Sequence, residues 1–213
     1  ELSLQFLSIE RLSQKKKLKA AILNEDILEI FPKVVNCLDL SHKKYKLTGN
    51  IPYYITGYLL RVLSQIKNKP ETISITMQKD VANRVVCTPP DMNILSASLQ
   101  FWGNPKIIKK VPRSSFSPPP EVESCIIKIK TKRQCPKKMQ TKYYSTVRAV
   151  FRHPRKTILN NLALASEVRQ EKRGLKKVLS NIGIEKKDRP QNLSVTKIIK
   201  MSKRVKFQRE KNS

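Results

Sequence analysis

The chain contains few glycine, cysteine, histidine and acidic residues. Its 213 residues include 5 glycines, 4 cysteines, 2 histidines and 16 aspartates and glutamates. No apolar run approaches the ~20 residues of a membrane span, and no signal-peptide pattern opens the chain. The cysteines form no Cys-x-x-Cys pair, which argues against a zinc site and a disulfide framework; they are Cys37, Cys87, Cys125 and Cys135. We therefore expect a cytoplasmic monomer that uses neither a metal nor a membrane.

Positive charge is what the chain has in excess. Its 44 lysines and arginines give a formal net charge of +28, more than solubility requires. Compositional bias would explain part of this excess, but the charge is clustered and aromatic residues lie among the clusters. Charge of this size attracts a polyanion through counterion release, and unpaired bases stack on aromatic rings. The pattern favours RNA as partner; the clusters are residues 15–17, 109–110, 128–133 and 148–156.

The tetrapeptide Asn50-Ile51-Pro52-Tyr53 combines groups suited to methyl transfer to the amino group of a planar base. That amine is a poor nucleophile because its lone pair is delocalised into the ring, so a catalyst must hold it with hydrogen-bond acceptors. Asn50 offers a side-chain carbonyl, and Pro52 restricts the residue before it, so that the Ile51 carbonyl can point outward. Tyr53 can stack on the base. The alternative is a strand end and proline turn whose aromatic residues cover the core.

The surroundings of the tetrapeptide predict an α/β arrangement. Residues 45–48 form a short strand pattern before it, and apolar residues follow at near-helical spacing over 55–68. Residues 72–77 alternate β-branched side chains and predict a strand, 79–86 predict a helix, and 121–130 predict a last strand. We expect a mixed sheet rather than a purely parallel one. In such folds ligands bind beyond the carboxyl ends of the strands.

The C-terminal third predicts a small helical unit. Its stretches with apolar residues three and four apart are separated by Pro154, Gly183 and Pro190, and Ser194 is a candidate N-cap of the last one. The basic segment 131–138 is a candidate linker. We therefore expect a first domain over 1–131 and a second over 138–213; the helical stretches are 143–151, 156–165, 174–182 and 195–202.

Distinctive segments follow one another along nearly the whole chain. They are residues 50–56 (Asn-Ile-Pro-Tyr-Tyr-Ile-Thr), 77–84 (Met-Gln-Lys-Asp-Val-Ala-Asn-Arg), 116–124 (Phe-Ser-Pro-Pro-Pro-Glu-Val-Glu-Ser), 151–162 (Phe-Arg-His-Pro-Arg-Lys-Thr-Ile-Leu-Asn-Asn-Leu) and 189–194 (Arg-Pro-Gln-Asn-Leu-Ser). In this order they resemble the motifs of the ribosomal RNA adenine N6-dimethyltransferases, most of all the small-subunit (16S) type. The resemblance implies a Rossmann-like class I methyltransferase domain, a small C-terminal helical domain and S-adenosylmethionine as cofactor.

The resemblance also implies roles for individual residues. Asn50, Ile51, Pro52 and Tyr53 would form the catalytic turn, and Phe116 would face Tyr53 across a flipped target adenine. The alternative for Phe116 is a core anchor that pins the proline-rich loop.

For the cofactor, the resemblance implies Glu1 on the ribose hydroxyls, the Glu25-Asp26 turn at the adenine amine, and Asn50 near the methyl group. Ser3 departs from the family's aspartate, and Asp26 could instead be a helix N-cap. The family has a glycine-rich turn after its first strand, whereas this sequence has no Gly-x-Gly pattern. We expect the chain to be N-terminally incomplete, without the first strand and the glycine-rich loop.

Basic residues are the expected RNA contacts, although each could belong to a solvated helix face. The family has Arg-Arg-Lys where this chain has Pro154-Arg155-Lys156, and Pro154 should break the helix. The candidates are Arg84, Arg113, Arg148, Arg152, Arg155 and Lys156.

The resulting hypothesis is methyl transfer to N6 of two adjacent adenosines in a hairpin near the 3′ end of small-subunit rRNA. One alternative is the large-subunit rRNA methyltransferase of the macrolide-resistance type, which shares the tetrapeptide. Another is a non-catalytic RNA-binding or transcription factor on the same fold.

Overall fold

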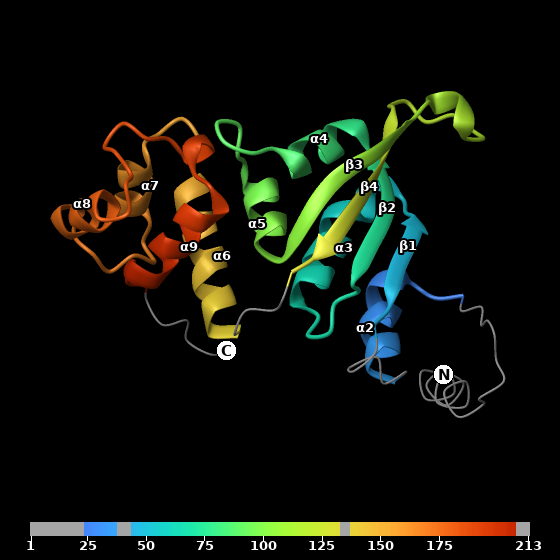
Figure 1. Ribbon diagram of the computed structural model, residues 1–213, viewed down its shortest axis with the longest axis horizontal. Helices are drawn as coiled ribbons and strands as arrows, with labels where there is room; N and C mark the ends of the chain where they lie inside the picture. Colours follow the sequence, from blue (N-terminus) through green and yellow to red (C-terminus); the bar gives the residue numbers. More distant parts are fainter. Residues whose placement is uncertain (1–23, 38–43, 133–136, 208–213) are drawn as a thin grey trace. The chain divides into compact units, whose positions relative to one another are not determined.

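The computed structural model describes residues 24–37, 44–132 and 137–207 (Figure 1). The chain divides into two compact units, which we call the sheet unit and the helical unit. The sheet unit takes its residues from 1–78 and 108–131, and the helical unit from 79–107 and 132–213. Glu1, the expected ribose ligand, lies outside the described residues.

The sheet is mixed, as the sequence predicted. Its strand order is β1-β2-β4-β3, with β1 (Lys46–Asn50) parallel to β2 (Thr72–Gln78) and β4 (Ser124–Thr131) antiparallel to β2. The strand β3 (Gly103–Val111) is next to β4 in this order, and its residues 108–111 belong to the sheet unit. The predicted strand over 121–130 begins later, at Ser124, because the segment before it is occupied by the proline-rich loop.

The core of the sheet unit follows from the alternation of β2 and β4. Every second residue of β2 is buried, since successive strand side chains point to opposite faces. The register places Ile73 opposite Ile129, and Ile75 opposite Ile127, so buried side chains meet directly. The helix α3 (Thr56–Gln65) adds buried leucines to this core, and α2 (Ile27–Cys37) packs against α3; the leucines are Leu59, Leu60 and Leu63.

The helical unit contains α4 (Lys79–Val86), α5 (Ile94–Trp102), α6 (Lys137–Phe151), α7 (Ile158–Leu164), α8 (Lys172–Ser180) and α9 (Val195–Arg204). The fully buried Tyr143 stacks on Phe101 with ring centroids 4.0 Å apart, and its hydroxyl donates to the Ala97 carbonyl at 2.8 Å. Burial raises the pKa of Tyr143, so this donor stays protonated.

Two local predictions for this unit are confirmed. The Ser194 hydroxyl accepts from the Lys197 amide at 3.2 Å and caps α9. The helix α6 ends at Phe151, shortly before Pro154, and the next helix begins at Ile158.

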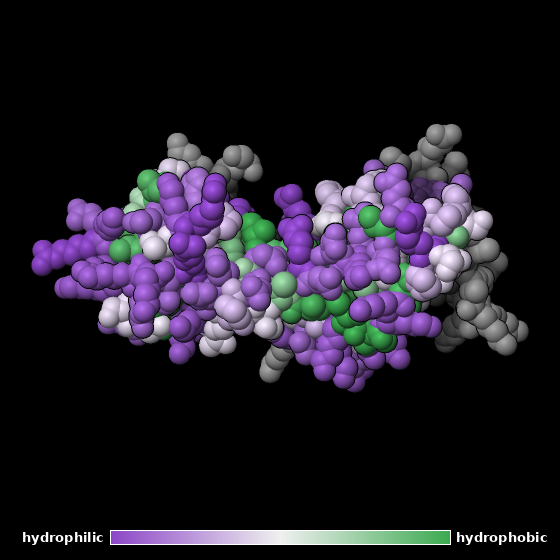
Figure 2. Space-filling view, turned by 90° about the horizontal axis from the view of Figure 1, so that it is seen from above, coloured by the Kyte–Doolittle hydropathy of each residue, from purple (hydrophilic) through white to green (hydrophobic). Residues whose placement is uncertain are grey.

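Hydrophilic residues cover most of the face shown in Figure 2, in keeping with the high content of lysine and arginine. Within the described part of the chain, no helix is both long and apolar enough to cross a membrane.

Candidate functional site

The strand register brings two of the predicted motifs to one edge of the sheet. Asn50, the last residue of β1, pairs with Thr76, which pairs in turn with Ile126. Gln78, the last residue of β2, pairs with Ser124, the first of β4. The parallel strands therefore end where β4 begins. The Asn50–Tyr53 turn and the loop before Ser124 leave the sheet at this same edge, the edge at which α/β proteins bind ligands.

The turn itself presents two hydrogen-bond acceptors. Asn50 is exposed, and among the described residues no hydrogen bond uses its side chain or the Ile51 carbonyl oxygen. Pro52 has φ −56° and ψ 138°, and its carbonyl accepts from the Ile55 amide at 3.2 Å, which starts the short 3-10 helix Tyr53–Ile55. The acceptors therefore belong to a turn whose backbone is fixed on both sides, by the sheet before it and the helix after it.

A hydrogen bond from β4 fixes the Tyr53 ring. The Tyr53 hydroxyl and the Ser124 hydroxyl are 2.5 Å apart, and either oxygen can be the donor. Ser124 is fully buried, whereas Tyr53 is half-buried. A ring held at its far end by a buried group cannot swing freely, so its orientation is set by the sheet. Ser124 was not predicted as a site residue, although it ends the 116–124 segment.

The proline-rich loop is closed by an arginine. The Arg113 Nε donates to the Pro120 carbonyl at 2.6 Å, across the short helix Arg113–Ser115 and the prolines that follow Phe116. The Phe116 amide donates to the Arg113 carbonyl at 3.2 Å, and the Phe116 side chain is half-buried. Arg113 was predicted from the sequence to contact RNA. The structure gives it a contact within the loop, made by one of its five N–H donors.

Asp26 caps a helix. Its Oδ1 accepts from the Leu28 amide at 2.8 Å, and its main-chain carbonyl accepts from the Glu29 and Ile30 amides at the start of α2. The residue is exposed, and within the described ranges no hydrogen bond or ion pair uses its second carboxylate oxygen. Glu25, beside it, is also exposed. The capping alternative is thus correct for one oxygen, and the other remains available to a ligand.

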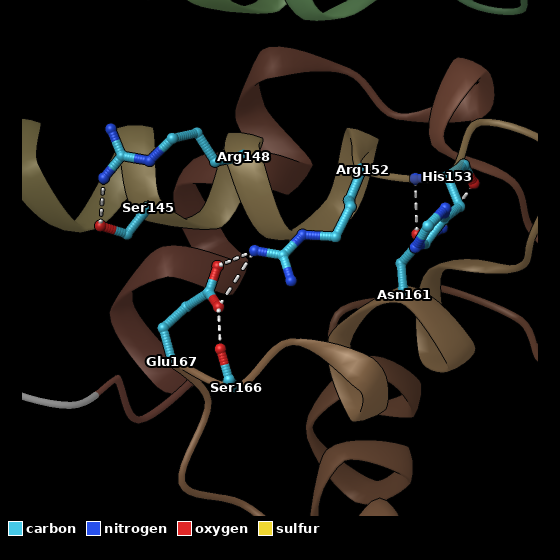
Figure 3. Close-up of polar contacts among 7 residues, drawn as sticks. All are labelled: Ser145, Arg148, Arg152, His153, Asn161, Ser166 and Glu167. Carbon is cyan, nitrogen blue, oxygen red and sulfur yellow. Dashed lines mark hydrogen bonds and ion pairs between the residues drawn. The ribbon is translucent and has the colours of Figure 1, made fainter.

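The basic candidates of the helical unit differ in their surroundings (Figure 3). Arg152, at the end of α6, is held by both oxygens of Glu167 at 3.0 and 3.2 Å. Arg148 donates to the Ser145 hydroxyl at 3.2 Å. Arg155 and Lys156 are exposed on the turn between α6 and α7, and Arg84 is exposed at the end of α4. Figure 3 shows Arg152 and Glu167 directed toward each other.

A buried asparagine shapes the turn that presents Arg155 and Lys156. The Asn161 side-chain oxygen accepts from the His153 amide at 3.0 Å. Its Nδ2 donates to the carbonyls of His153, Lys156 and Thr157 at 2.9, 3.2 and 3.2 Å. The Asn161 side chain is fully buried. Figure 3 draws its contact with His153. The sequence offers two neighbouring asparagines here, and only the fold distinguishes Asn161 from Asn160.

Comparison with protein families gives one match that covers almost the whole chain. The family model described as ribosomal RNA adenine dimethylase matches residues 1–204. Among curated proteins, the ribosomal RNA small subunit methyltransferase A of Dehalococcoides mccartyi is 36% identical over 176 residues, which are 82% of this chain and 59% of that protein. The chain thus spans about three fifths of the length of this relative.

Solved structures agree on the fold. A dimethyladenosine transferase from Plasmodium falciparum has a TM-score of 0.60 at 24% identity, covering 74% of this chain and 65% of that one. The 23S rRNA methyltransferase ErmE also has a TM-score of 0.60, at 16% identity, covering 93% of this chain and 97% of that one. At these identities the structural likeness shows a shared fold.

Proposed function

Because the chain belongs to the ribosomal RNA adenine dimethylase family, we propose that it takes part in ribosome biogenesis as an rRNA (adenine-N6,N6)-dimethyltransferase. Its substrate would be two adjacent adenosines in a hairpin near the 3′ end of small-subunit rRNA, and its methyl donor S-adenosylmethionine. The relatives named as small-subunit methyltransferases favour this target over large-subunit RNA. The likeness to ErmE concerns the fold alone.

The observation that supports this function most directly is the pair of unused acceptors at the end of β1. The Asn50 side-chain oxygen and the Ile51 carbonyl would each accept one hydrogen of the adenine amine. Two such bonds favour a pyramidal nitrogen, whose lone pair is then withdrawn from the ring and directed at the methyl donor. No strong general base is needed, since a methylated ammonium nitrogen loses its proton readily to water. Catalysis would rest on positioning.

The two aromatic rings would hold the base. Tyr53, fixed by Ser124, offers one face, and Phe116, on the loop closed by Arg113, would offer the other. Both lie on segments that leave the same edge of the sheet. Stacking on both faces would offset part of the cost of removing the adenine from the RNA helix.

The hydrogen-bond acceptors of the described residues suit part of S-adenosylmethionine. The second carboxylate oxygen of Asp26, with Glu25 beside it, would accept from the adenine amine of the cofactor, and Asn50 would lie near the methyl group. When bound, the cofactor supplies an electrophilic methyl group. Glu1 would bind the ribose hydroxyls.

We assign RNA binding to the exposed basic residues. We also propose that the chain consists of a methyltransferase domain (1–131) and a helical RNA-binding domain (138–213). Arg155 and Lys156 are the best placed for phosphates, because the Asn161 contacts present them on an exposed turn. Arg84, Arg113, Arg148 and Arg152 are assigned the same role. A cytoplasmic location and a monomeric state complete the proposal.

The function is tested by methyl transfer from labelled S-adenosylmethionine to purified small ribosomal subunits that lack the modification, compared with large-subunit RNA. We expect label on adenosines of the small subunit only. Asn50→Ala should lose turnover and keep its RNA affinity, since Asn50 is exposed and supports no other described side chain. Label on large-subunit RNA would select the alternative enzyme, and the absence of transfer to either RNA would overturn the proposal for this chain.

Cofactor binding is tested separately by calorimetric titration with S-adenosylmethionine. We expect Asp26→Ala to abolish the heat of binding. Because Asp26 also caps α2, Asp26→Ser is the matched variant. The serine hydroxyl can still accept from the Leu28 amide and keep the cap, whereas the second carboxylate oxygen is lost. If Asp26→Ser binds like the unaltered chain, Asp26 is a capping residue only.

A further inference from the structure

Two aromatic side chains, Tyr54 and Tyr58, are exposed on the helical segment that begins at Tyr53. Tyr54 is 88% exposed and Tyr58 is 56% exposed. Among the described large hydrophobic side chains of the sheet unit, only Ile108 is exposed to a similar extent. Tyr54 is in the short 3-10 helix Tyr53–Ile55 and Tyr58 is in the first turn of α3, so the two side chains leave neighbouring turns of a continuous helical segment. Arg61, a further turn along, is also exposed. Within the described ranges, none of the three side chains makes a hydrogen bond or an ion pair.

A glycine, Gly57, lies between the two tyrosines in the sequence and has open space beside its Cα. Gly57 is in the first turn of α3, between Tyr54 and Tyr58. A Cβ built on it would meet nothing within 4 Å, and its backbone does not have a positive φ. Neither packing nor backbone geometry therefore requires glycine here, although glycine is less favourable than alanine inside a helix. Close approach of a flat ligand to the backbone would explain it.

We propose that Tyr54, Gly57, Tyr58 and Arg61 form a stacking platform for the unpaired RNA nucleotides next to the target adenosine. Arg61 would bind a phosphate of the same strand. The inference rests on the proposed function, because it assumes that the base held by Tyr53 belongs to RNA. The platform would extend the catalytic site to the nucleotides that neighbour the target adenosine on the same RNA strand, through residues outside the tetrapeptide.

Charge and position both select RNA as the occupant. The chain carries +28, so an exposed face with an arginine attracts a polyanion rather than a second copy of itself. Tyr54 directly follows Tyr53, whose ring would stack on the target base. Nucleotides on either side of that base would therefore lie next to the helical segment that begins with these two residues. Rings separated by one helical turn suit successive bases, since stacking tolerates any base.

The test measures binding of a fluorescent hairpin RNA with two adjacent loop adenosines to the 213-residue chain. Tyr54→Ala and Tyr58→Ala should each weaken binding about 5- to 150-fold, the range for loss of one stacked base. Tyr54→Phe and Tyr58→Phe should bind normally, because the ring remains. Gly57→Leu should also weaken binding, since a bulky side chain fills the open space. Ile108→Ala, which trims another exposed apolar side chain of the sheet unit, is the control and should change nothing.

Abasic RNA distinguishes stacking from an indirect effect. With abasic nucleotides on both sides of the adenosines, Tyr54→Ala and the unaltered chain should bind equally. An equal loss on intact and abasic RNA would overturn the platform. So would a dimer in sedimentation that Tyr54→Ala converts to monomer, since the face would then be a self-association surface.

Methyl transfer by the unaltered chain, measured in parallel, keeps the two proposals apart. If methyl transfer occurs and binding does not depend on the rings, the platform is wrong and the function stands. Ring-dependent binding without transfer would support the platform in an RNA-binding protein and refute the enzyme.

Discussion

The hydrogen bond between Tyr53 and Ser124 should respond unequally to removal of its two partners. The oxygens are 2.5 Å apart, Ser124 is fully buried and Tyr53 is only half-buried. Tyr53→Phe leaves the Ser124 hydroxyl buried without a partner, which costs about 1–3 kcal/mol. Ser124→Ala leaves a phenol that water can reach, so only the net value of the bond is lost, about 0.5–1.5 kcal/mol.

The double variant completes a thermodynamic cycle. Tyr53→Phe with Ser124→Ala removes both polar groups together, so it should cost no more than Tyr53→Phe alone. Thermal denaturation of the four proteins resolves these differences, because 1 kcal/mol shifts the midpoint by about 2–4 °C in a chain of this size. Tyr58→Phe is the matched control, since the Tyr58 hydroxyl has no partner among the described residues, and it should leave the midpoint unchanged.

Two results would contradict the expected difference between the two variants. Strictly additive effects in the double variant would mean that the two hydroxyls do not interact. A larger loss for Ser124→Ala than for Tyr53→Phe would mean that Ser124 is held by something other than the phenol, and the orientation of the ring would then need another cause.

Further predictions concern other described contacts. Asn161→Ala should lower the free energy of unfolding by about 2–4 kcal/mol, because a fully buried side chain loses all its hydrogen bonds, whereas the adjacent Asn160→Ala should change little in the same urea titration. Equal losses for both would contradict the assignment. Burial lowers the pKa of Lys69 from 10.5 to about 8, so between these pH values the unfolded chain binds more protons and stability should rise with pH. Lys69→Met should show a smaller rise in denaturation curves over this range, and an unchanged slope would rule out Lys69 as the source. Glu167→Gln should strengthen RNA binding at low salt in filter assays, because it releases Arg152 from its ion pair, and unchanged affinity would remove Arg152 from the RNA contacts.

The elements predicted best are those whose signal is local. The alternation over 72–77 predicted β2 because the period of two is imposed by the strand itself. The helix over 79–86 has the bounds that the sequence indicated, and Ser194 caps α9 through a contact only three residues long. The last strand was predicted to start before Ser124, since its alternation extends into a loop that the arginine contact closes.

Strand period, helix spacing and the order of the motifs can all be read along one chain, so the mixed sheet, the helices that follow it and the family were predictable from the residues alone. The contacts that hold the site residues in place depend instead on how the chain packs. Tyr53 and Ser124 are 71 residues apart, and nothing local links them until antiparallel pairing of β4 with β2 brings Ser124 to the end of β1. In the same way, burial selects Asn161 over Asn160 and pairs Arg152 with Glu167, because burial and long-range contact are properties of the packed chain.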